Sequence, residues 1–172
     1  FMYFDEDLLL DLRLNVLNKY VKKFIITEST FLHSGKSKKL NFDIKNFQKF
    51  KDKIKYIVVD KIPEGIEKVQ SSDKLEIKNK KILDNSLKRE NNQRNKLNSG
   101  LKGVHDEDLI LSSDLDEIPN FSNFKFKKKI TLFEQDVFYY KFNLLQPNFK
   151  WIGTRACKKK NLLSFQWLRN IK

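Results

Sequence analysis

The chain has 172 residues, of which 40% are hydrophobic, and its 35 Lys and Arg against 22 Asp and Glu give a formal net charge of +13. This length suffices for one domain with a buried core, and we expect residues 1–172 to form a single domain. The one cysteine excludes an internal disulfide and a zinc site built from several cysteines. No apolar run approaches the roughly 20 residues that cross a bilayer.

The ends of the chain carry no recognisable targeting signal. No basic segment precedes an apolar one at the start, as a signal peptide would require, and a cytoplasmic protein is therefore expected. Because the chain starts at Phe1 with apolar residues, we also expect a domain truncated at one or both ends. Targeting or anchoring segments could then lie outside it.

The positive charge allows two interpretations. Lysines supply most of it and are spread along the chain, which is typical of a solvated surface. A net charge of this size also fits the binding of nucleic acid, anionic lipid or a phosphorylated ligand. A basic nucleic-acid-binding module without catalytic activity is therefore the alternative function, although the sequence shows no clustered basic face interleaved with aromatic residues.

The first predicted elements are a strand, a helix and two more strands. Residues 1–4 (FMYF) predict a short buried strand, and Asp5 can cap the following helix by accepting the free N–H groups of its first turn. Apolar residues at spacings of three and four define one face of this helix: Leu9, Leu12, Val16 and Tyr20. Compact apolar runs at residues 22–29 and 54–60 predict interior strands.

The second half of the chain predicts a long helix followed by further strands. Residues 66–81 are polar and predict a loop with helical pieces, whereas residues 82–101 predict a helix with Gly103 just past its end. Residues 109–113 predict another buried strand, and aromatic runs within residues 130–145 predict more. Short apolar strands alternating with helices favour an α/β fold with a mainly parallel sheet flanked by helices.

Acidic residues follow three of the predicted strands, namely Glu28, Asp60 and Asp114. Ligands bind at the carboxyl ends of such strands, although an acid there is also a common turn residue or helix cap. Asp114 and Asp116 differ, because two carboxylates two residues apart past a buried strand repel each other unless a cation lies between them. Mg²⁺ and Mn²⁺ prefer oxygen ligands and leave positions open for phosphate oxygens, so the pair predicts a divalent-metal site.

The helix before this strand has a mixed face. Its members step by three and four residues: Leu83, Leu87, Glu90, Arg94, Leu97 and Leu101. Glu90 and Arg94 interrupt an apolar stripe and can meet as an i,i+4 pair. They form either an ion pair at the margin of the core, or a site in which Arg94 or nearby Arg89 binds the phosphates of a ligand and Glu90 orients it.

Three blocks of the sequence resemble glycosyltransferase family 17, the β-1,4-mannosyl-glycoprotein β-1,4-N-acetylglucosaminyltransferase-like proteins. The blocks are FDEDLLLDLRLNVLNKYVKKFIITESTFLHSGKSKKLNF, RENNQRNKLNSGL and DLILSSDLDEIP, and the resemblance runs in order from Phe1 to about Thr154. It implies a GT-A-like (Rossmann-like) fold with Mn²⁺ or Mg²⁺ as cofactor. It also implies inverting transfer of a sugar, N-acetylglucosamine by this likeness, from a UDP-sugar donor to a hydroxyl of a glycan acceptor.

The resemblance also implies roles for single residues. Asp114 and Asp116 would be the Asp-x-Asp pair, with Asp116 the main metal ligand, Asp114 nearer the ribose and metal, and Glu117 supporting both. The residues that bind the nucleotide sugar would be Asp5, Glu28, Arg89, Glu90, Arg94 and Asp114. Trp151, in the block WIGT, would stack on an acceptor sugar or else is a core aromatic residue.

The catalytic base is not identified by the resemblance. Inverting transfer needs a carboxylate that deprotonates the acceptor hydroxyl, and the candidates are Glu134 and Asp136, either of which could be a solvated turn residue. A family block with Trp, His, Phe and Ser is not found before Lys172, and His33 and His105 do not match it. We therefore expect a truncated chain, or a divergent and inactive one. An Asp-x-Asp phosphatase is disfavoured, because its acidic pair usually lies on the first strand.

Overall fold

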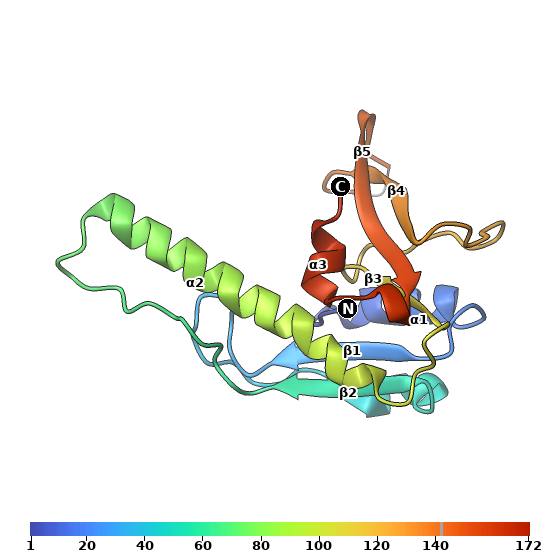
Figure 1. The fold of residues 1–172 in the computed structure, drawn as a ribbon, viewed down its shortest axis with the longest axis horizontal. Helices are drawn as coiled ribbons and strands as arrows, with labels where there is room; N and C mark the ends of the chain where they lie inside the picture. Colours follow the sequence, from blue (N-terminus) through green and yellow to red (C-terminus); the bar gives the residue numbers. More distant parts are fainter. Residues whose placement is uncertain (142) are drawn as a thin grey trace.

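A computed structural model of the chain describes residues 1–141 and 143–172, and these form a mixed α/β structure (Figure 1). The helices are α1 (Asp7–Leu17), α2 (Leu75–Lys96) and α3 (Phe165–Asn170), with 3₁₀ turns η1 (Ile44–Phe50), η2 (Leu97–Leu101) and η3 (Lys159–Asn161). The strands are β1 (Phe24–Ser29), β2 (Ile54–Val59), β3 (Leu109–Ser112), β4 (Ile130–Phe138) and β5 (Leu145–Lys158). Within these residues no helix is both long enough and apolar enough to cross a membrane.

The strands form two small sheets, which corrects the prediction of one mainly parallel sheet. β1 and β2 pair in parallel, and Met2 makes an isolated parallel bridge to Thr27. β3, β5 and β4 form an antiparallel sheet in that order. β4 and β5 are antiparallel because a short connection joins them, whereas a parallel pair needs a long crossover.

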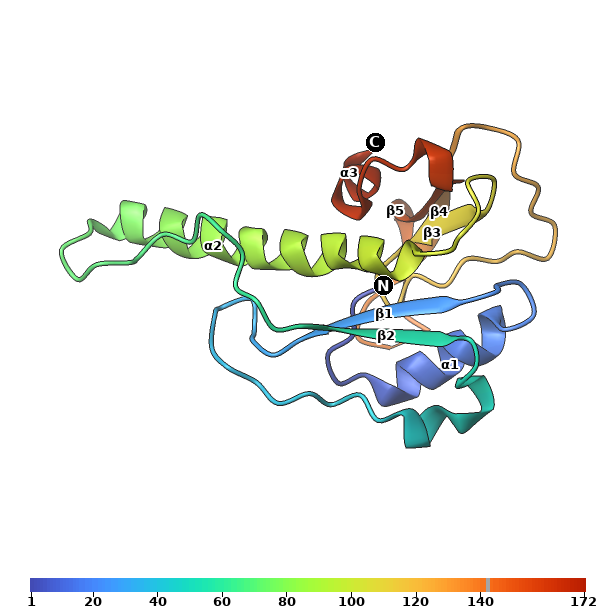
Figure 2. The ribbon, with the colours of Figure 1, turned by 60° about the horizontal axis from the view of Figure 1, so that its bottom comes forward.

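The parallel pair has helices on both faces, as predicted. In Figure 2, α1 and η1 lie on one side of β1 and β2, and α2 lies on the other. The core on the α1 side joins Leu10, Leu14 and Leu17 of that helix to aromatic residues that include Phe24 of β1 and Phe47 of η1. This arrangement brings the carboxyl ends of the N-terminal segment and of β1 to the same edge of the sheet.

The buried face of α1 differs from the predicted one. Leu12, Val16 and Tyr20 of the predicted face are exposed, and the helix buries residues one or two positions away instead, including Arg13. Asp5 does not cap the helix; Glu6 precedes it, and its carboxylate accepts hydrogen bonds from nearby backbone N–H groups without capping α1. Seven of the eleven residues of α1 are apolar and they lie on more than one side of the helix, so spacing alone could not choose between two adjacent faces.

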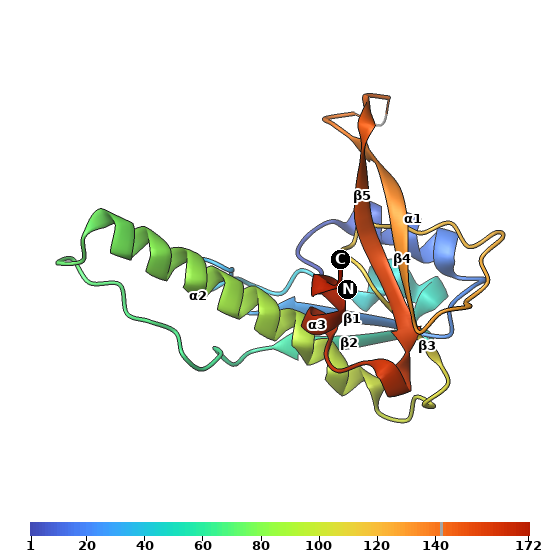
Figure 3. The same ribbon diagram turned by 45° about the horizontal axis from the view of Figure 1, so that its top comes forward.

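The long helix α2 also packs differently from the prediction. It begins seven residues earlier than predicted, at Leu75, and projects well beyond the sheets (Figure 3). Leu83 and Leu87 are exposed, and the buried residues are polar: Asn85, Arg89, Gln93 and Arg94. These polar side chains can be buried because they hydrogen-bond to other groups, mostly to backbone carbonyls of neighbouring loops and strands. Only Leu97 and Leu101, which lie in η2, enter a core, together with Ile110 and Phe165.

Candidate functional site

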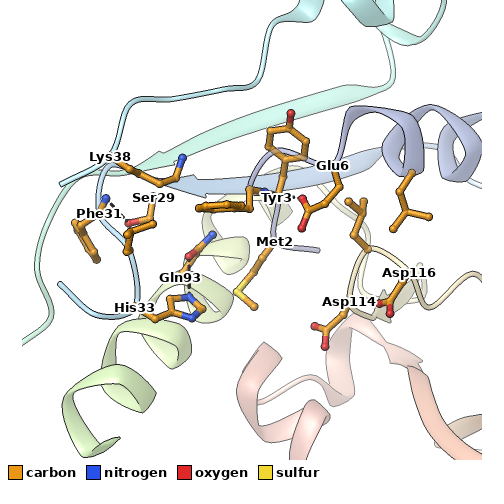
Figure 4. A pocket seen from close by; sticks show the side chains of 14 residues that line it. Met2, Tyr3, Glu6, Ser29, Phe31, His33, Lys38, Gln93, Asp114 and Asp116 are labelled. Atoms are coloured by element: carbon orange, nitrogen blue, oxygen red, sulfur yellow. Dashed lines mark hydrogen bonds between the residues drawn. The ribbon is translucent and has the colours of Figure 1, made fainter. Parts of the chain in front are cut away.

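A pocket of about 530 Å³ lies where the N-terminal segment, β1 and β3 end. Its walls come from several elements: Met2, Tyr3, Phe4, Glu6, Leu9, Ser29, Phe31, Leu32, His33, Lys38, Gln93, Asp114, Leu115 and Asp116. Figure 4 shows Asp114 and Asp116 at one end and His33, Gln93 and Lys38 at the other. Chain segments that are far apart in the sequence therefore meet at the carboxyl edge predicted to bind a ligand.

The acidic turn after β3 is held from behind by a buried arginine. Arg13, with 4% of its surface exposed, donates from Nη1 to the carbonyls of Asp114, Leu115 and Glu117 at 3.0–3.1 Å. Its Nη2 donates to the Ser113 hydroxyl at 2.5 Å. These hydrogen bonds satisfy backbone carbonyls that lie past the end of β3. They also fix the backbone of the turn that carries the carboxylates.

Glu117 is buried and receives hydrogen bonds from three sides. The Trp151 indole N–H and Arg169 Nη1 each donate to it at 2.7 Å, and the backbone N–H of Asp114 donates at 2.8 Å. Burial alone would raise the pKa of Glu117, but these hydrogen bonds and the Arg169 charge outweigh burial and lower it. Glu117 is therefore an ionised group that ties β5 and α3 to the acidic turn.

Asp114 is half-buried and lies between two guanidinium groups. Arg169 Nη2 donates to its Oδ2 at 2.7 Å, and Arg94 Nη2 lies 3.4 Å from its Oδ1. Arg94 also pairs with Glu90 at 2.8 Å, so the predicted i,i+4 pair forms. Its Nη1 donates to Gln166 of α3 at 2.5 Å. The Glu90–Arg94 pair thus reaches Asp114 and also joins α2 to α3.

Asp116 is the exposed carboxylate of the turn and borders the pocket. Desolvation by the surrounding protein, with the negative charges of Glu117 and Asp114 adding to it, raises its pKa. A cation next to Asp116 would relieve this repulsion. Among the described residues no three His, Cys, Asp or Glu side chains come together as a complete metal site. Asp116 with Asp114 nevertheless fits the common Mg²⁺ arrangement of one or two carboxylates completed by waters and substrate phosphates.

Glu28 and Arg89, both predicted to bind the nucleotide sugar, are engaged with other parts of the protein. The fully buried Glu28 carboxylate accepts from Lys38 at 2.5 Å, from Tyr56 at 2.7 Å and from two backbone N–H groups of the segment after β1. Arg89 donates to the His33 carbonyl at 2.9 Å. Gly35, with φ of +92°, lets this loop approach Arg89 closely, because an added Cβ would lie 2.7 Å from Arg89 Nη2. Both residues therefore hold the loop that lines the pocket.

The remaining predicted residues lie at different places. Asp5 is exposed and is not among the pocket-lining residues, where its neighbour Glu6 is found. Trp151 is 43% exposed and lies close to the acidic turn through its bond to Glu117. Glu134 and Asp136 flank Gln135, whose carboxamide faces Thr154 on the side of Glu117. Because side chains alternate along a strand, both carboxylates project to the other face, where Asp136 pairs with Lys150.

Several site residues were not predicted from the sequence. Arg169 comes from α3, past the end of the resemblance, and Arg13 stands in an apolar helix as its one basic residue between Leu10 and Leu17. The position of Arg13 among apolar residues could have indicated a site residue, because an arginine on a buried helical face must find hydrogen-bond partners. Cys157 is buried, and burial raises the pKa of its thiol to about 11, which excludes it as a ready nucleophile at neutral pH.

Comparison with known proteins decides the family. The sequence profile of glycosyltransferase family 17 matches residues 2–156, which include the pocket, the acidic turn and Trp151. The chain belongs to glycosyltransferase family 17. Neither the curated proteins nor the solved structures contain a match to it. As a member of this family it has a glycosyltransferase role, and Arg169 lies outside the matched segment of the family 17 chain.

Proposed function

We propose that the pocket binds a UDP-sugar together with Mn²⁺ or Mg²⁺, and that the protein transfers the sugar to a hydroxyl of a glycan acceptor with inversion. N-acetylglucosamine is the proposed sugar, and the fold is proposed to be a variant of the GT-A type. The observation that carries the proposal is the position of Asp114 and Asp116 on the pocket, at the end of a buried strand in a family 17 chain.

Each part of the pocket can contribute to donor binding. Asp116, with Asp114 beside it, would hold the metal ion, which neutralises charge on the departing diphosphate when it is bound. Arg94 and Arg169 pair with Asp114 and hold its carboxylate in place. The far end, at His33, Gln93 and Lys38, offers hydrogen-bonding groups beside the apolar Phe31. We propose that this end receives the nucleoside.

The acceptor is proposed to bind next to Trp151. Its ring is partly exposed while its N–H is held by Glu117, so the ring plane is fixed and one part of it remains open to solvent. The exposed part of this aromatic ring can pack on the apolar face of a sugar ring, while its N–H keeps a buried hydrogen-bond partner.

Calorimetric titration with UDP, in the presence and absence of Mn²⁺, tests the proposal. Binding should depend on Mn²⁺, and Asp116→Ala should abolish the metal-dependent part. Asp60→Asn is the matched control, because Asp60 also follows a strand and is exposed but does not line the pocket. UDP binding that is equal with and without Mn²⁺, or Mn²⁺-dependent binding that persists in Asp116→Ala, would contradict the metal assignment.

A further inference from the structure

The end of the pocket away from the acidic turn contains a short chain of hydrogen bonds. Gln93 of α2 is 6% exposed, and its side-chain Nε2 donates to the backbone carbonyl of Thr27 at 3.2 Å. Its side-chain oxygen Oε1 lies 3.4 Å from Nε2 of His33, the contact drawn as a dashed line in Figure 4. His33 belongs to the loop after β1, and both His33 and Gln93 line the pocket.

The backbone carbonyl of Thr27 fixes the direction of this chain. A carbonyl only accepts hydrogen bonds, so the amide nitrogen of Gln93 must face Thr27 and its oxygen must face His33. Nε2 of His33 must then carry the ring proton in order to donate to that oxygen. A neutral imidazole has one protonated nitrogen, so Nδ1 of His33 keeps a lone pair and is a hydrogen-bond acceptor. Within the described part of the chain, nothing donates to this Nδ1.

The loop that carries His33 is held by contacts that do not involve the imidazole ring. Arg89 Nη1 donates to the backbone carbonyl of His33 at 2.9 Å, and Gly35 packs closely on the same guanidinium. The backbone N–H of Phe31 donates to the Ser29 hydroxyl at 3.2 Å. The acceptor is therefore positioned before any ligand arrives, and a change of the His33 side chain should leave the loop backbone in place.

An acceptor at this position distinguishes between nucleobases. Uracil carries a hydrogen on ring nitrogen N3 and donates there, whereas N3 of cytosine is an acceptor. Nδ1 of His33 can thus bond to the N3–H of uracil, but would meet the N3 of cytosine lone pair to lone pair. Met2, Phe31 and Leu32 line the pocket as well and supply apolar surface on which a planar base can pack.

We propose that Nδ1 of His33 accepts a hydrogen bond from N3–H of a uracil base, and that Gln93 is the positioning residue that keeps this nitrogen unprotonated. The proposal rests on the proposed function, because it requires the nucleoside to enter this end of the pocket. It adds the residue that selects uracil over cytosine. The other tautomer of His33 would turn a lone pair toward Oε1 of Gln93 and leave that buried oxygen without a donor, which costs free energy.

The first experiment measures the tautomer of His33 without any nucleotide. A long-range ¹H–¹⁵N correlation spectrum of the full chain, recorded at about pH 8 where imidazoles are ordinarily neutral, should show His33 protonated on Nε2 only. In Gln93→Leu the share of the Nδ1-protonated tautomer should rise. His105 is the other histidine of the chain and the internal control, because its Nδ1 accepts from the backbone N–H of Glu107 at 3.2 Å. A proton on Nδ1 of His33 in the parent chain would overturn the proposal.

The second experiment compares UDP with CDP by calorimetry in the presence of Mn²⁺. The two nucleotides share ribose and diphosphate and differ at the base edge, so the contribution of the metal cancels in the ratio of their affinities. UDP should bind roughly tenfold or more tightly than CDP, and His33→Phe should bring the two affinities within about twofold of each other. His33→Asn can place an amide oxygen near the position of Nδ1 and should restore part of the preference. Ser34→Ala is the matched control, because Ser34 is the next residue of the loop, is exposed and does not line the pocket.

The outcomes separate this proposal from the proposed function. Mn²⁺-dependent binding of UDP with an equal affinity for CDP would leave the proposed function standing and overturn the role of His33. A preference for UDP that persists unchanged in His33→Phe would do the same. Absence of UDP binding in the parent chain would contradict the proposed function, and the role of His33 would fall with it.

Discussion

Guanidinium groups, more than carboxylates, determine the conformation of the acidic turn. Arg13 binds the turn carbonyls from the α1 side, and Arg169 bridges the carboxylates of Asp114 and Glu117 from the α3 side. A planar guanidinium can donate to two oxygens in fixed directions, so it sets orientation as well as charge. With Asp114 and Glu117 held in this way, Asp116 is the carboxylate of the turn left open toward the pocket.

Arg169→Gln tests this arrangement. The substitution leaves the buried Glu117 and the half-buried Asp114 without their shared cation, and we expect the free energy of unfolding to fall by about 2–3 kcal/mol. Arg169→Lys keeps the charge but not the paired geometry and should lose about half as much. Urea denaturation followed by circular dichroism measures both. Equal stability of Arg169→Gln and the parent chain would show that the bridge is absent in solution.

Glu28 is predicted to make folding sensitive to acid. Burial raises its pKa, but bonds from Lys38, Tyr56 and backbone N–H groups outweigh burial and hold the pKa below the usual 4.5. A carboxylate whose pKa is lowered by folding stabilises the protein above the unfolded-state pKa, and this contribution is lost as the pH falls through the folded-state value. This loss of stability should therefore occur at pH values below 4.5.

Glu28→Gln should remove part of this dependence on pH. At pH 7 the variant loses the charged bonds and should be less stable by about 2–4 kcal/mol. The difference should shrink as the pH falls below 4.5 and Glu28 in the parent chain becomes protonated. Urea midpoints across this pH range give the comparison. Glu134→Gln, at an exposed site, is the control and should follow the parent chain. A constant difference at all pH values would contradict the assignment.

Individual residues show what sequence could and could not predict. The position of Asp114 and Asp116 at the end of a strand was predicted, because an apolar run followed by acidic residues is a local pattern. The role of Glu28 was not visible, since its partners lie ten or more residues away and include backbone N–H groups. Arg169 gave no local signal, because its partners Asp114 and Glu117 are more than fifty residues away in the chain.

At the scale of elements, the helix α2 shows why periodicity misled. An apolar stripe was predicted through Leu83 and Leu87, yet the sheet ends before the helix does, so these residues have no core to enter. The buried positions, Asn85 and Gln93 among them, pack on backbone carbonyls of loops and strands. Hydrophobic spacing predicts which face is apolar, but only tertiary structure decides whether a partner covers that face.

Alanine substitutions in and just after α2 should therefore differ. Leu97→Ala removes a side chain that is 1% exposed from the second core and should cost about 3 kcal/mol. Leu83→Ala, where the side chain is 60% exposed, should change the free energy of unfolding by less than about 0.5 kcal/mol, because alanine also favours the helix. Thermal and urea unfolding of the two variants measures this. A large loss in Leu83→Ala would mean that another part of the molecule covers this face.

At the scale of the whole molecule, the sequence predicted the order of elements better than their assembly. The α/β class, the parallel pairing of β1 with β2 and the helices on both of its faces follow from local runs and spacing. The antiparallel sheet did not, because β3 pairs with β5 across more than thirty residues and no local pattern specifies such a partner. The site was predictable where it follows strand ends, and not where it depends on α3.

The net charge of +13 leads to a prediction that separates the two functions considered. Lys158, Lys159 and Lys160 pair with acidic residues of one turn, so part of the basic surface is already compensated. Attraction of the remaining lysines to duplex DNA is nonspecific and should weaken by orders of magnitude between about 50 and 200 mM salt. Binding of UDP in a pocket formed by fixed side chains should change far less over that range.

A competition experiment makes this prediction decisive. At about 150 mM salt, an excess of a nonspecific 20-base-pair duplex should leave the calorimetric affinity for UDP with Mn²⁺ unchanged within about twofold, because surface lysines and the pocket bind independently. Lys125→Ala combined with Lys127→Ala, in an exposed lysine-rich segment, should weaken DNA binding and leave UDP binding intact. If the duplex displaces UDP, nucleic acid enters the pocket, and the nucleic-acid-binding alternative becomes the better account of this chain.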